Sequence, residues 1–176
     1  MAEEKLNVGI LGVGAVGGFL AALSYVKGID VTCIVSPDRA EALKKNGIAY
    51  RTKLFGEGVA HPNVVSELAR ALDRVIVTVK APYLSAALKR ISILKEPSHV
   101  ISLLNGVGHA KRLRSETKTS VIIGTVGNLE TYLDADGIVV SESARPVIEL
   151  SGSPEMLQSD VSFFEKIGIS DRKSVV

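Results

Sequence analysis

Apolar residues in the first part of the chain occur in short runs, separated by turn residues and by amphipathic stretches. Residues 6–11 predict a buried strand, and the apolar residues that follow a glycine-rich turn, as far as about Val26, predict a helix. Residues 30–35 are mostly β-branched or apolar and predict a second buried strand. Residues 37–45 predict the next helix, which the Asn46-Gly47 pair ends. The chain therefore begins as alternating strands and helices.

The stretch between residues 48 and 72 has a less regular pattern. Residues 49–53 and 58–61 predict two short strands of a hairpin that turns at residues 55–58. Residues 66–72 predict a short helix. This excursion interrupts the alternation of strands and helices.

From residue 74 onward the alternation resumes. The pattern predicts strand, helix, strand, helix and strand, in that order, at residues 74–79, 82–93, 99–104, 108–115 and 120–126. Strands that alternate with helices in this way predict a parallel sheet with helices on both faces.

The last third of the chain has a different pattern. Residues 129–133 and 138–141 predict a hairpin across an acidic turn, and residues 146–150 add a strand. Ser153 is expected to cap a further helix, and residues 169–176 show no pattern of regular structure. The predicted fold class is therefore α/β, with a mainly parallel sheet and a short antiparallel β extension near the C-terminus.

Length and charge limit the classes of protein to which the chain can belong. A length of 176 residues fits one domain, or one domain with a small appendage. The 21 basic and 19 acidic side chains nearly balance and form no long run of one sign, so no nucleic-acid partner is expected. The three histidines lack metal-ligand spacing, so no metal site is predicted. Cys33, the single cysteine, predicts a buried thiol in a reducing cytoplasm.

A glycine-rich turn joins the first strand to the first helix. Gly12, Gly14 and Gly17 have the G-x-G-x-x-G spacing of dinucleotide-binding folds. The first glycine permits a tight turn, the second leaves room for a pyrophosphate, and the third lets the helix pack closely on the strand. Ala15 and Val16 lie at the helix N-terminus, where free N–H groups favour an anion. The turn therefore predicts a Rossmann-type, doubly wound fold with a dinucleotide cofactor.

A membrane-spanning helix is the alternative interpretation of residues 6–26, because the stretch lacks charge and is long enough to cross a bilayer. It also contains the Gly14-x-x-x-Gly18 spacing found in membrane helix contacts. Against this interpretation, the glycines and Asn7 weaken a single helix, and the residues before it are not the basic region of a signal peptide. Alternating strands and helices follow it. We therefore expect a protein without membrane contact.

The residues after the second strand indicate which nicotinamide cofactor is preferred. An acidic side chain at this point binds the ribose 2′-hydroxyl of NAD and would repel the 2′-phosphate of NADP. Here Ser36 follows the strand and Arg39 is close enough to pair with a phosphate, which favours NADP (NADPH). Asp38 could instead turn inward, and Ser36 could serve only as a helix cap, so NAD remains an alternative.

Three polar residues follow buried strands, at the edge of a parallel sheet where ligands bind. They are Lys80, Asn105 and Thr125. A lysine there can neutralise a carboxylate or the alkoxide that develops when a ketone accepts hydride, and an asparagine can hydrogen-bond an amide, a ribose or a substrate. The alternatives are a lysine that ends its strand in solvent and an Asn-Gly turn pair.

Several motifs occur in the order and at the spacing of one enzyme family. They are the glycine motif at residues 12–18, Val79-Lys80-Ala81, Leu-Asn-Gly-Val-Gly at residues 104–108, Ile-Gly-Thr at residues 123–125, and Asp-Gly-Ile-Val at residues 136–139. With these motifs the chain resembles the ketopantoate reductases (2-dehydropantoate 2-reductases) over residues 6–168.

The resemblance implies an oxidoreductase that uses NADPH to reduce 2-dehydropantoate (ketopantoate) to pantoate in pantothenate and coenzyme A biosynthesis. It implies catalytic roles for Lys80 and Asn105, which would contact both cofactor and substrate near the nicotinamide. Gly12, Gly14 and Gly17 would hold the pyrophosphate. The expected partner is a small 2-keto acid substrate, and a homodimer is one of the oligomeric states left open.

The chain departs from the family pattern at two points. Ser36 stands where the family usually has an arginine that meets the 2′-phosphate. The family's helical second domain, which supplies a lysine proton donor and an acidic substrate-binding residue, is expected to be absent. Residues 1–168 would form the Rossmann domain, and residues 169–176 a truncated connection to the missing domain. We therefore expect the isolated chain to bind NADP(H) but to turn over poorly.

Two other functions fit the same predicted fold. One is a related two-domain, NAD(P)-dependent reductase of another 2-keto acid or of an imine. The other is a non-catalytic, nucleotide-sensing Rossmann module. Such modules commonly have an acidic residue after the second strand, which Ser36 does not provide, and they would leave Lys80 and Asn105 without a role.

Overall fold

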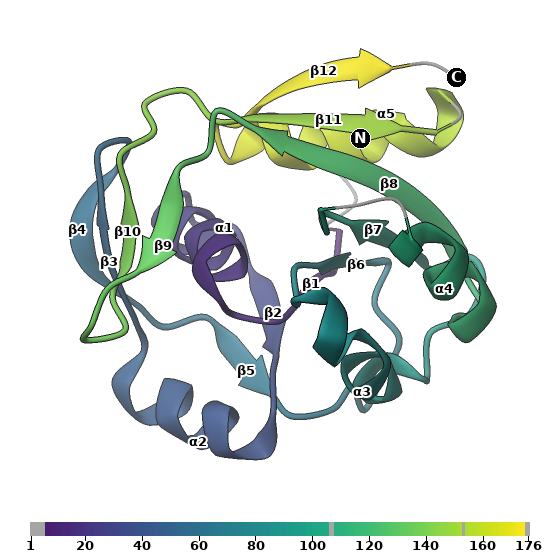
Figure 1. The fold of residues 1–176 in the computed structure, drawn as a ribbon, viewed down its shortest axis with the longest axis horizontal. Coiled ribbons are helices and arrows are strands. Elements are labelled where there is room, and N and C mark those ends of the chain that lie inside the picture. Colours follow the sequence, from purple (N-terminus) through teal and green to yellow (C-terminus); the bar gives the residue numbers. More distant parts are fainter. Residues whose placement is uncertain (1–5, 106–107, 153, 175–176) are drawn as a thin grey trace.

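Eight strands form the main sheet of the computed structural model, which describes residues 6–105, 108–152 and 154–174 (Figure 1). In spatial order the strands are β12 (Ser170–Ser174), β11 (Val147–Ser151), β8 (Ser120–Gly127), β7 (His99–Ser102), β6 (Arg74–Val77), β1 (Val8–Leu11), β2 (Val31–Ile34) and β5 (Asn63–Val65). The six strands from β8 to β5 are parallel to one another, whereas β11 is antiparallel to β8 and parallel to β12. The predicted fold class, a mainly parallel sheet with a short antiparallel part near the C-terminus, is confirmed.

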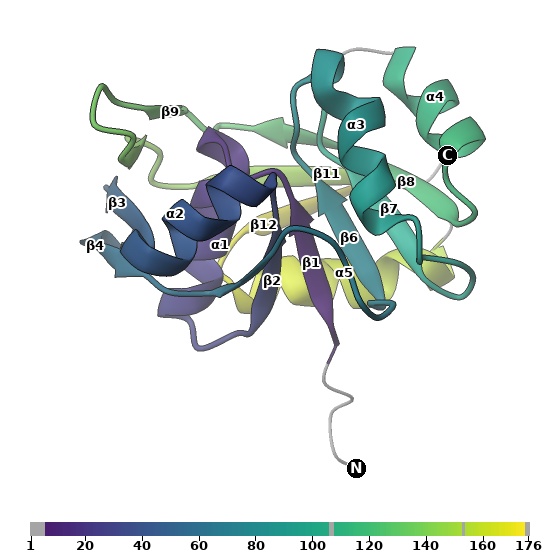
Figure 2. The same ribbon diagram turned by 90° about the horizontal axis from the view of Figure 1, so that it is seen from below.

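Helices cover both faces of this sheet (Figure 2). They are α1 (Ala15–Val26), α2 (Pro37–Asn46), α3 (Leu84–Leu88) between the 3-10 turns η1 (Ala81–Tyr83) and η2 (Lys89–Ile91), α4 (Gly108–Glu116) and α5 (Pro154–Lys166). Buried side chains of α1, α2 and α5 share one hydrophobic cluster, and those of α3 and α4 share the other. The sheet is thus the middle of three layers, which leaves the ends of its strands as the place for a site.

A second sheet of four strands packs beside α1. Its order is β4 (Gly56–Ala60), β3 (Ile48–Thr52), β10 (Val139–Ser141) and β9 (Thr131–Leu133). The two predicted hairpins are confirmed, because β3 pairs with β4 and β9 with β10 in antiparallel fashion. The parallel pairing of β3 with β10, which joins the hairpins into one sheet, was not predicted.

The helix predicted at residues 66–72 does not form. Leu68 and Leu72 are buried, but the backbone bends, and the Leu68 N–H donates to the Arg90 carbonyl at 2.9 Å instead of to a helical partner. The strand β5, which precedes this segment and pairs with β2, was also not predicted. Tertiary contacts of the leucines therefore replace the local helical bonds.

The structure also differs from the sequence-based predictions at the end of the chain. Residues 170–174, for which no regular structure was expected, form β12 at the edge of the main sheet. The expected helix cap, Ser153, lies outside the described residues. The stretch considered as a membrane helix is instead β1, a turn and the 12-residue helix α1. None of the helices in the described ranges has the length and apolar character needed to cross a bilayer.

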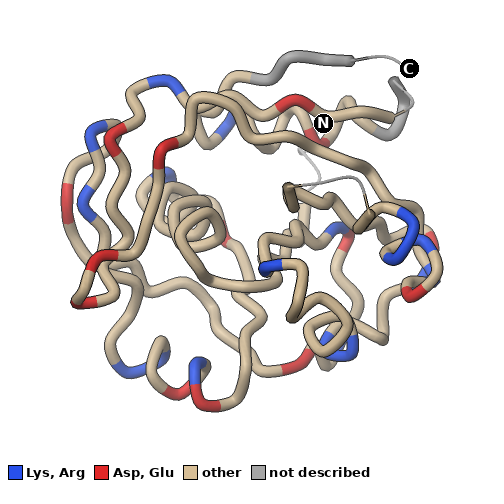
Figure 3. The backbone as a smooth tube through the Cα atoms, viewed as in Figure 1, with Lys and Arg blue, Asp and Glu red and all other residues tan. Residues whose placement is uncertain are grey.

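Charged residues are spread over the described chain. Lysines and arginines are interspersed with aspartates and glutamates along the backbone. Among the described residues they form no extended stretch of one sign (Figure 3). Local charge around a cavity therefore decides more about ligands than overall charge does.

Candidate active site

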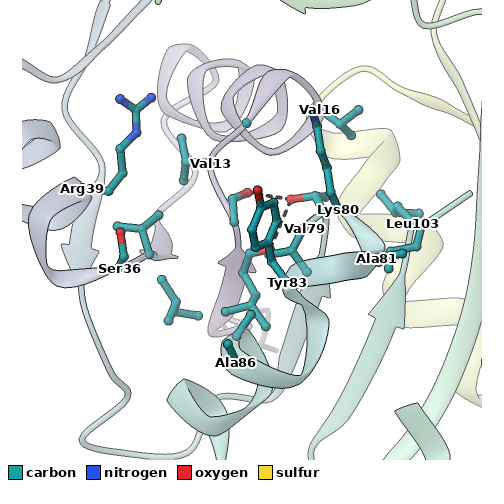
Figure 4. A pocket seen from close by; sticks show the side chains of 18 of the residues that line it. Val13, Val16, Ser36, Arg39, Val79, Lys80, Ala81, Tyr83, Ala86 and Leu103 are labelled. Atoms are coloured by element: carbon teal, nitrogen blue, oxygen red, sulfur yellow. Dashed lines mark hydrogen bonds between the residues drawn. The ribbon is translucent and has the colours of Figure 1, made fainter. Parts of the chain in front are cut away.

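A pocket of about 830 Å³ opens at the carboxyl ends of the parallel strands (Figure 4). Its lining comes from the loop after β1, the end of β2 and start of α2, the segment after β6 with α3, and the end of β7. The predicted residues among its lining are Gly12, Gly14, Ala15, Val16, Ser36, Arg39, Lys80 and Asn105. The fold thus brings together side chains that are far apart in the sequence, as expected for a parallel sheet.

The glycines of the turn have different surroundings. Gly12 has φ +95°, a value that L side chains rarely adopt, and its N–H donates to the Ile34 carbonyl at 2.9 Å. A Cβ at Gly14 would meet nothing within 4 Å, because this glycine faces the pocket. A Cβ at Gly17 would lie 1.9 Å from the Gly12 carbonyl oxygen. Gly17 therefore lies behind the loop, where it permits close packing of α1, and does not line the pocket.

Thr78, which the sequence analysis did not single out, holds the turn in place. Its hydroxyl donates to the Gly12 carbonyl at 2.6 Å and lies 3.3 Å from the Leu11 carbonyl oxygen. Its N–H donates to the Leu11 carbonyl at 3.0 Å. Thr78 was hidden inside the strand predicted at residues 74–79, although the strand ends at Val77. The segment after β6 is thus bonded directly to the glycine turn.

Ser36 and Arg39 border one end of the pocket, on the side of α2 (Figure 4). Ser36 occupies the N-cap position of α2, but its hydroxyl makes no capping hydrogen bond. Within the described chain neither side chain has a hydrogen-bond or ion-pair partner, and both are exposed. Asp38 is exposed as well, but it is not among the lining residues. The arrangement leaves a hydroxyl and a guanidinium available to a ligand.

Lys80 and Asn105 border the other side of the pocket. Lys80 follows β6 and Asn105 follows β7, and both side chains are exposed without a protein partner among the described residues. Thr125, the third strand-end candidate, is exposed in β8 where it pairs with Glu149 of β11, and it is not among the lining residues. The strand β8 extends to Gly127, so Thr125 lies within the strand and not at its end.

Tyr83 and Arg90 also line the pocket, although no motif in the sequence singled them out. Tyr83 is 66% exposed at the mouth of the pocket, and Arg90 lines its wall. Tyr83, Ala87 and Arg90 are spaced four and three residues apart, which places them on one face of a helix. That spacing could have identified the face from the sequence. With Arg39 and Lys80, the charged residues of the described lining are all positive.

A separate polar cluster lies at the opposite edge of the sheet, where β6 and β7 begin. The fully buried Asp160 of α5 accepts a hydrogen bond from Arg74, and its two carboxylate oxygens lie 3.0 Å from His99 Nε2. Arg74 also donates to the Ser159 hydroxyl at 3.1 Å. Burial lowers the pKa of Arg74, and the Asp160 carboxylate opposes this effect. This cluster fastens α5 to the sheet and is remote from the pocket.

No group of three or more histidine, cysteine, aspartate or glutamate side chains within the described ranges could hold a metal ion. The pocket instead combines a glycine turn, the N-terminus of α1 and positive side chains, a set of groups suited to a ligand with phosphates. Residues 8–150 match the family model described as ketopantoate reductase PanE/ApbA. The chain belongs to the ketopantoate reductase family.

Similar proteins support this membership. The chain is 30% identical over 137 residues to the uncharacterized oxidoreductase YkpB of Bacillus subtilis, a match that covers 77% of the chain and 45% of YkpB. It is also 30% identical over 109 residues to a 2-dehydropantoate 2-reductase of Mesorhizobium japonicum, with 58% of the chain and 32% of that protein covered. The chain therefore spans less than half of the length of these two relatives.

Solved structures show the same fold at low sequence identity. A PanE/ApbA family ketopantoate reductase of Ralstonia eutropha has a TM-score of 0.83 at 23% identity, with 96% of this chain and 56% of that one covered. D-mandelate dehydrogenase, solved with NADH and anilino(oxo)acetate, has a TM-score of 0.82 at 22% identity, with 96% and 57% covered. The fold is thus shared with a ketopantoate reductase and with a dehydrogenase that was solved with NADH.

Proposed function

We propose that the chain is the cofactor-binding part of an NADPH-dependent reductase that converts 2-dehydropantoate (ketopantoate) to pantoate. The observation that carries the NADP preference is the charge of the pocket. Arg39, Lys80 and Arg90 are its charged lining residues in the described chain, and no aspartate or glutamate lies among them. NADP has a 2′-phosphate in addition to its pyrophosphate, and an acidic lining would repel it.

The glycine turn would hold the pyrophosphate of the cofactor. Gly14 leaves the backbone open to the pocket, and Ala15 and Val16 begin α1, where the first N–H groups of a helix lack intrahelical partners. Ser36 and Arg39 would meet the 2′-phosphate, since both border the pocket without a protein partner in the described chain. A charge-assisted hydrogen bond from an arginine is the strongest of these contacts.

Lys80 and Asn105 would act where the ketone is reduced. The chemistry that a nicotinamide cofactor would supply there is a hydride for the carbonyl carbon, which would leave negative charge on the carbonyl oxygen. The ammonium of Lys80 would offset that charge, and the Asn105 amide would orient the substrate or the ribose by hydrogen bonds. Both residues line the pocket together with Ala81 and Leu104, beside the ends of β6 and β7. This geometry places a cation next to an open, partly apolar cleft.

The alternative is a related reductase of another 2-keto acid. The similarity to YkpB, which is not assigned to ketopantoate, and the fold shared with D-mandelate dehydrogenase support keeping this alternative. A comparison of ketopantoate with other 2-keto acids as oxidants of NADPH would separate the two reactions. Because the chain spans about half of its structural relatives, we propose that the isolated chain binds the cofactor but turns over slowly.

Calorimetric titration of the chain with NADPH and with NADH tests the cofactor proposal. We expect NADPH to bind more tightly, and Arg39→Gln to reduce that preference by about tenfold, the value of one charge-assisted hydrogen bond. Lys44→Gln is the matched control, because Lys44 is exposed on the same helix and outside the pocket. Tighter binding of NADH would contradict the proposal. Rapid ketopantoate-dependent oxidation of NADPH by the chain would contradict the expected slow turnover.

A further inference from the structure

Arg90 occupies a fixed position in the wall of the pocket. It follows α3 in the turn η2, it is half-buried, and its Nη1 donates to the Ser66 carbonyl at 3.0 Å. This is the one hydrogen bond of its guanidinium within the described chain, although the group has five N–H donors. The guanidinium is therefore anchored on one side and has donors left for a ligand.

The anchor places this guanidinium beside the end of β2. Ser66 follows Val65, the last residue of β5, and the Val65 carbonyl accepts a hydrogen bond from the Val35 N–H at 3.1 Å. Val35 in turn precedes Ser36. Arg90 thus reaches the end of the strand next to β2, from the side of the sheet covered by α3. Arg39 approaches the same pocket from α2, on the other side.

We infer that Arg90 is a second arginine for the 2′-phosphate of the cofactor and acts together with Arg39. The inference rests on the proposed function, and it assigns a specificity role to a residue of α3's C-terminal turn. A phosphomonoester carries up to two negative charges and several acceptor oxygens, so it can bind two guanidinium groups at once. A ligand without this phosphate would leave Arg90 with its Ser66 bond alone.

A purely structural role is the competing explanation for Arg90. Its carbonyl accepts the Leu68 N–H at 2.9 Å while its side chain binds Ser66, so the residue also ties the segment after β5 to η2. Loss of that tie would disturb the pocket for every ligand alike. A role in phosphate recognition would affect only ligands that carry the 2′-phosphate.

The test uses two probes that differ in this one group, adenosine 2′,5′-bisphosphate and adenosine 5′-monophosphate. We expect Arg90→Gln to weaken binding of the bisphosphate by about tenfold or more in calorimetry, and to leave binding of the monophosphate unchanged. Arg90→Lys, which keeps a positive donor, should retain part of the preference. Arg70→Gln is the control, because Arg70 is exposed on the segment after β5 that Arg90 contacts, but lies outside this pocket.

The outcomes separate the inference from the cofactor proposal. Equal losses for both probes, or no loss for either, in a protein that still prefers NADPH to NADH would overturn the role of Arg90 and leave the proposed function intact. A wild-type chain that binds NADPH no better than NADH would overturn both. Thermal unfolding of each variant checks that it folds. If Arg90→Gln does not fold, Arg90→Lys decides the question: a lysine variant that keeps the full wild-type preference for the bisphosphate at high salt would count against the inference.

Discussion

Gly14 precedes α1 and Gly17 lies three positions later within that helix, and the two glycines have opposite surroundings. A methyl group at residue 17 would overlap the Gly12 carbonyl oxygen at 1.9 Å and the Thr78 hydroxyl at 2.5 Å, whereas one at residue 14 would project into open space. We expect Gly17→Ala to lower the free energy of unfolding by about 3 kcal/mol, the upper range for overpacking. Gly14→Ala should change it by less than about 0.5 kcal/mol but weaken NADPH binding about tenfold.

Chemical denaturation and calorimetry on both variants check this pair of expectations. A Gly14→Ala protein that binds NADPH as tightly as the wild type would contradict the role of the turn in holding the pyrophosphate. A Gly17→Ala protein of normal stability would show that α1 can move away from the turn at little cost.

The buried thiol of Cys33 makes the free energy of unfolding depend on pH in the alkaline range. Burial raises the pKa of its thiol from 9.0 to about 12. Above pH 9 the unfolded chain loses this proton while the native protein keeps it, so the unfolded state binds fewer protons and the free energy of unfolding falls as pH rises. We expect a contribution to this fall of up to about 1.4 kcal/mol per pH unit between these pKa values.

The comparison is between wild type and Cys33→Ala, unfolded by urea at several pH values from neutral to alkaline. Other groups titrate equally in both proteins, so the difference in slope isolates the thiol. Parallel slopes would mean that the thiol ionises as easily in the native protein as in the unfolded chain.

At the scale of elements, Thr78 couples the loops that follow β1 and β6. Thr78→Val keeps the shape of the side chain but removes the hydrogen bond to the Gly12 carbonyl. We expect it to lower the free energy of unfolding by about 1 kcal/mol and to weaken NADPH binding severalfold, because the turn loses its support. Thr125→Val, at an exposed position of β8 outside the pocket, is the matched control. Unchanged NADPH affinity in Thr78→Val would indicate that the turn holds its position without this bond.

Most elements of the fold could be predicted because their apolar runs are local signals. The strands β1, β2, β6, β7 and β8 and the helices between them follow from such runs and from glycine, proline and serine at their ends. Residues 66–72 were mispredicted for a physical reason. Leu68 and Leu72 have helical spacing, but their side chains pack in the core from a bent backbone. This backbone is hydrogen-bonded to Arg90 and not within a helix. The periodicity of apolar residues identifies which side chains are buried, but it does not fix the backbone conformation that carries them.

The site was predictable to a similar degree. Strand ends and the glycine spacing located Gly12, Gly14, Ser36, Lys80 and Asn105, because parallel topology carries these positions to one edge. Residues that line the pocket from the side of a helix were not found in this way. The helical spacing of Tyr83, Ala87 and Arg90 shows their shared face, but the anchor of Arg90 on the Ser66 carbonyl is a tertiary contact that no motif spacing encodes.

At the scale of the whole molecule, α5 depends on the buried cluster of Asp160, Arg74 and His99. Asp160→Ala would leave the buried Arg74 without its counter-charge, so we expect a loss of about 3–5 kcal/mol in the free energy of unfolding by urea. Glu116→Ala removes a comparable partner from the exposed Arg112, and it should leave the unfolding midpoint almost unchanged. Equal effects of the two variants would contradict the assigned role of the cluster.

The four-stranded sheet beside α1 has a consequence for how the chain reaches its native state. Tyr50 of β3 is paired with Val139 of β10, so the loop that this contact closes includes β5, β6, β7 and β8. The entropy of closing such a long loop is recovered only after the intervening segments are ordered. Each hairpin, by contrast, forms from neighbouring residues. Folding of this region should therefore end with the docking of two preformed hairpins onto α1, a late step that follows assembly of the parallel strands.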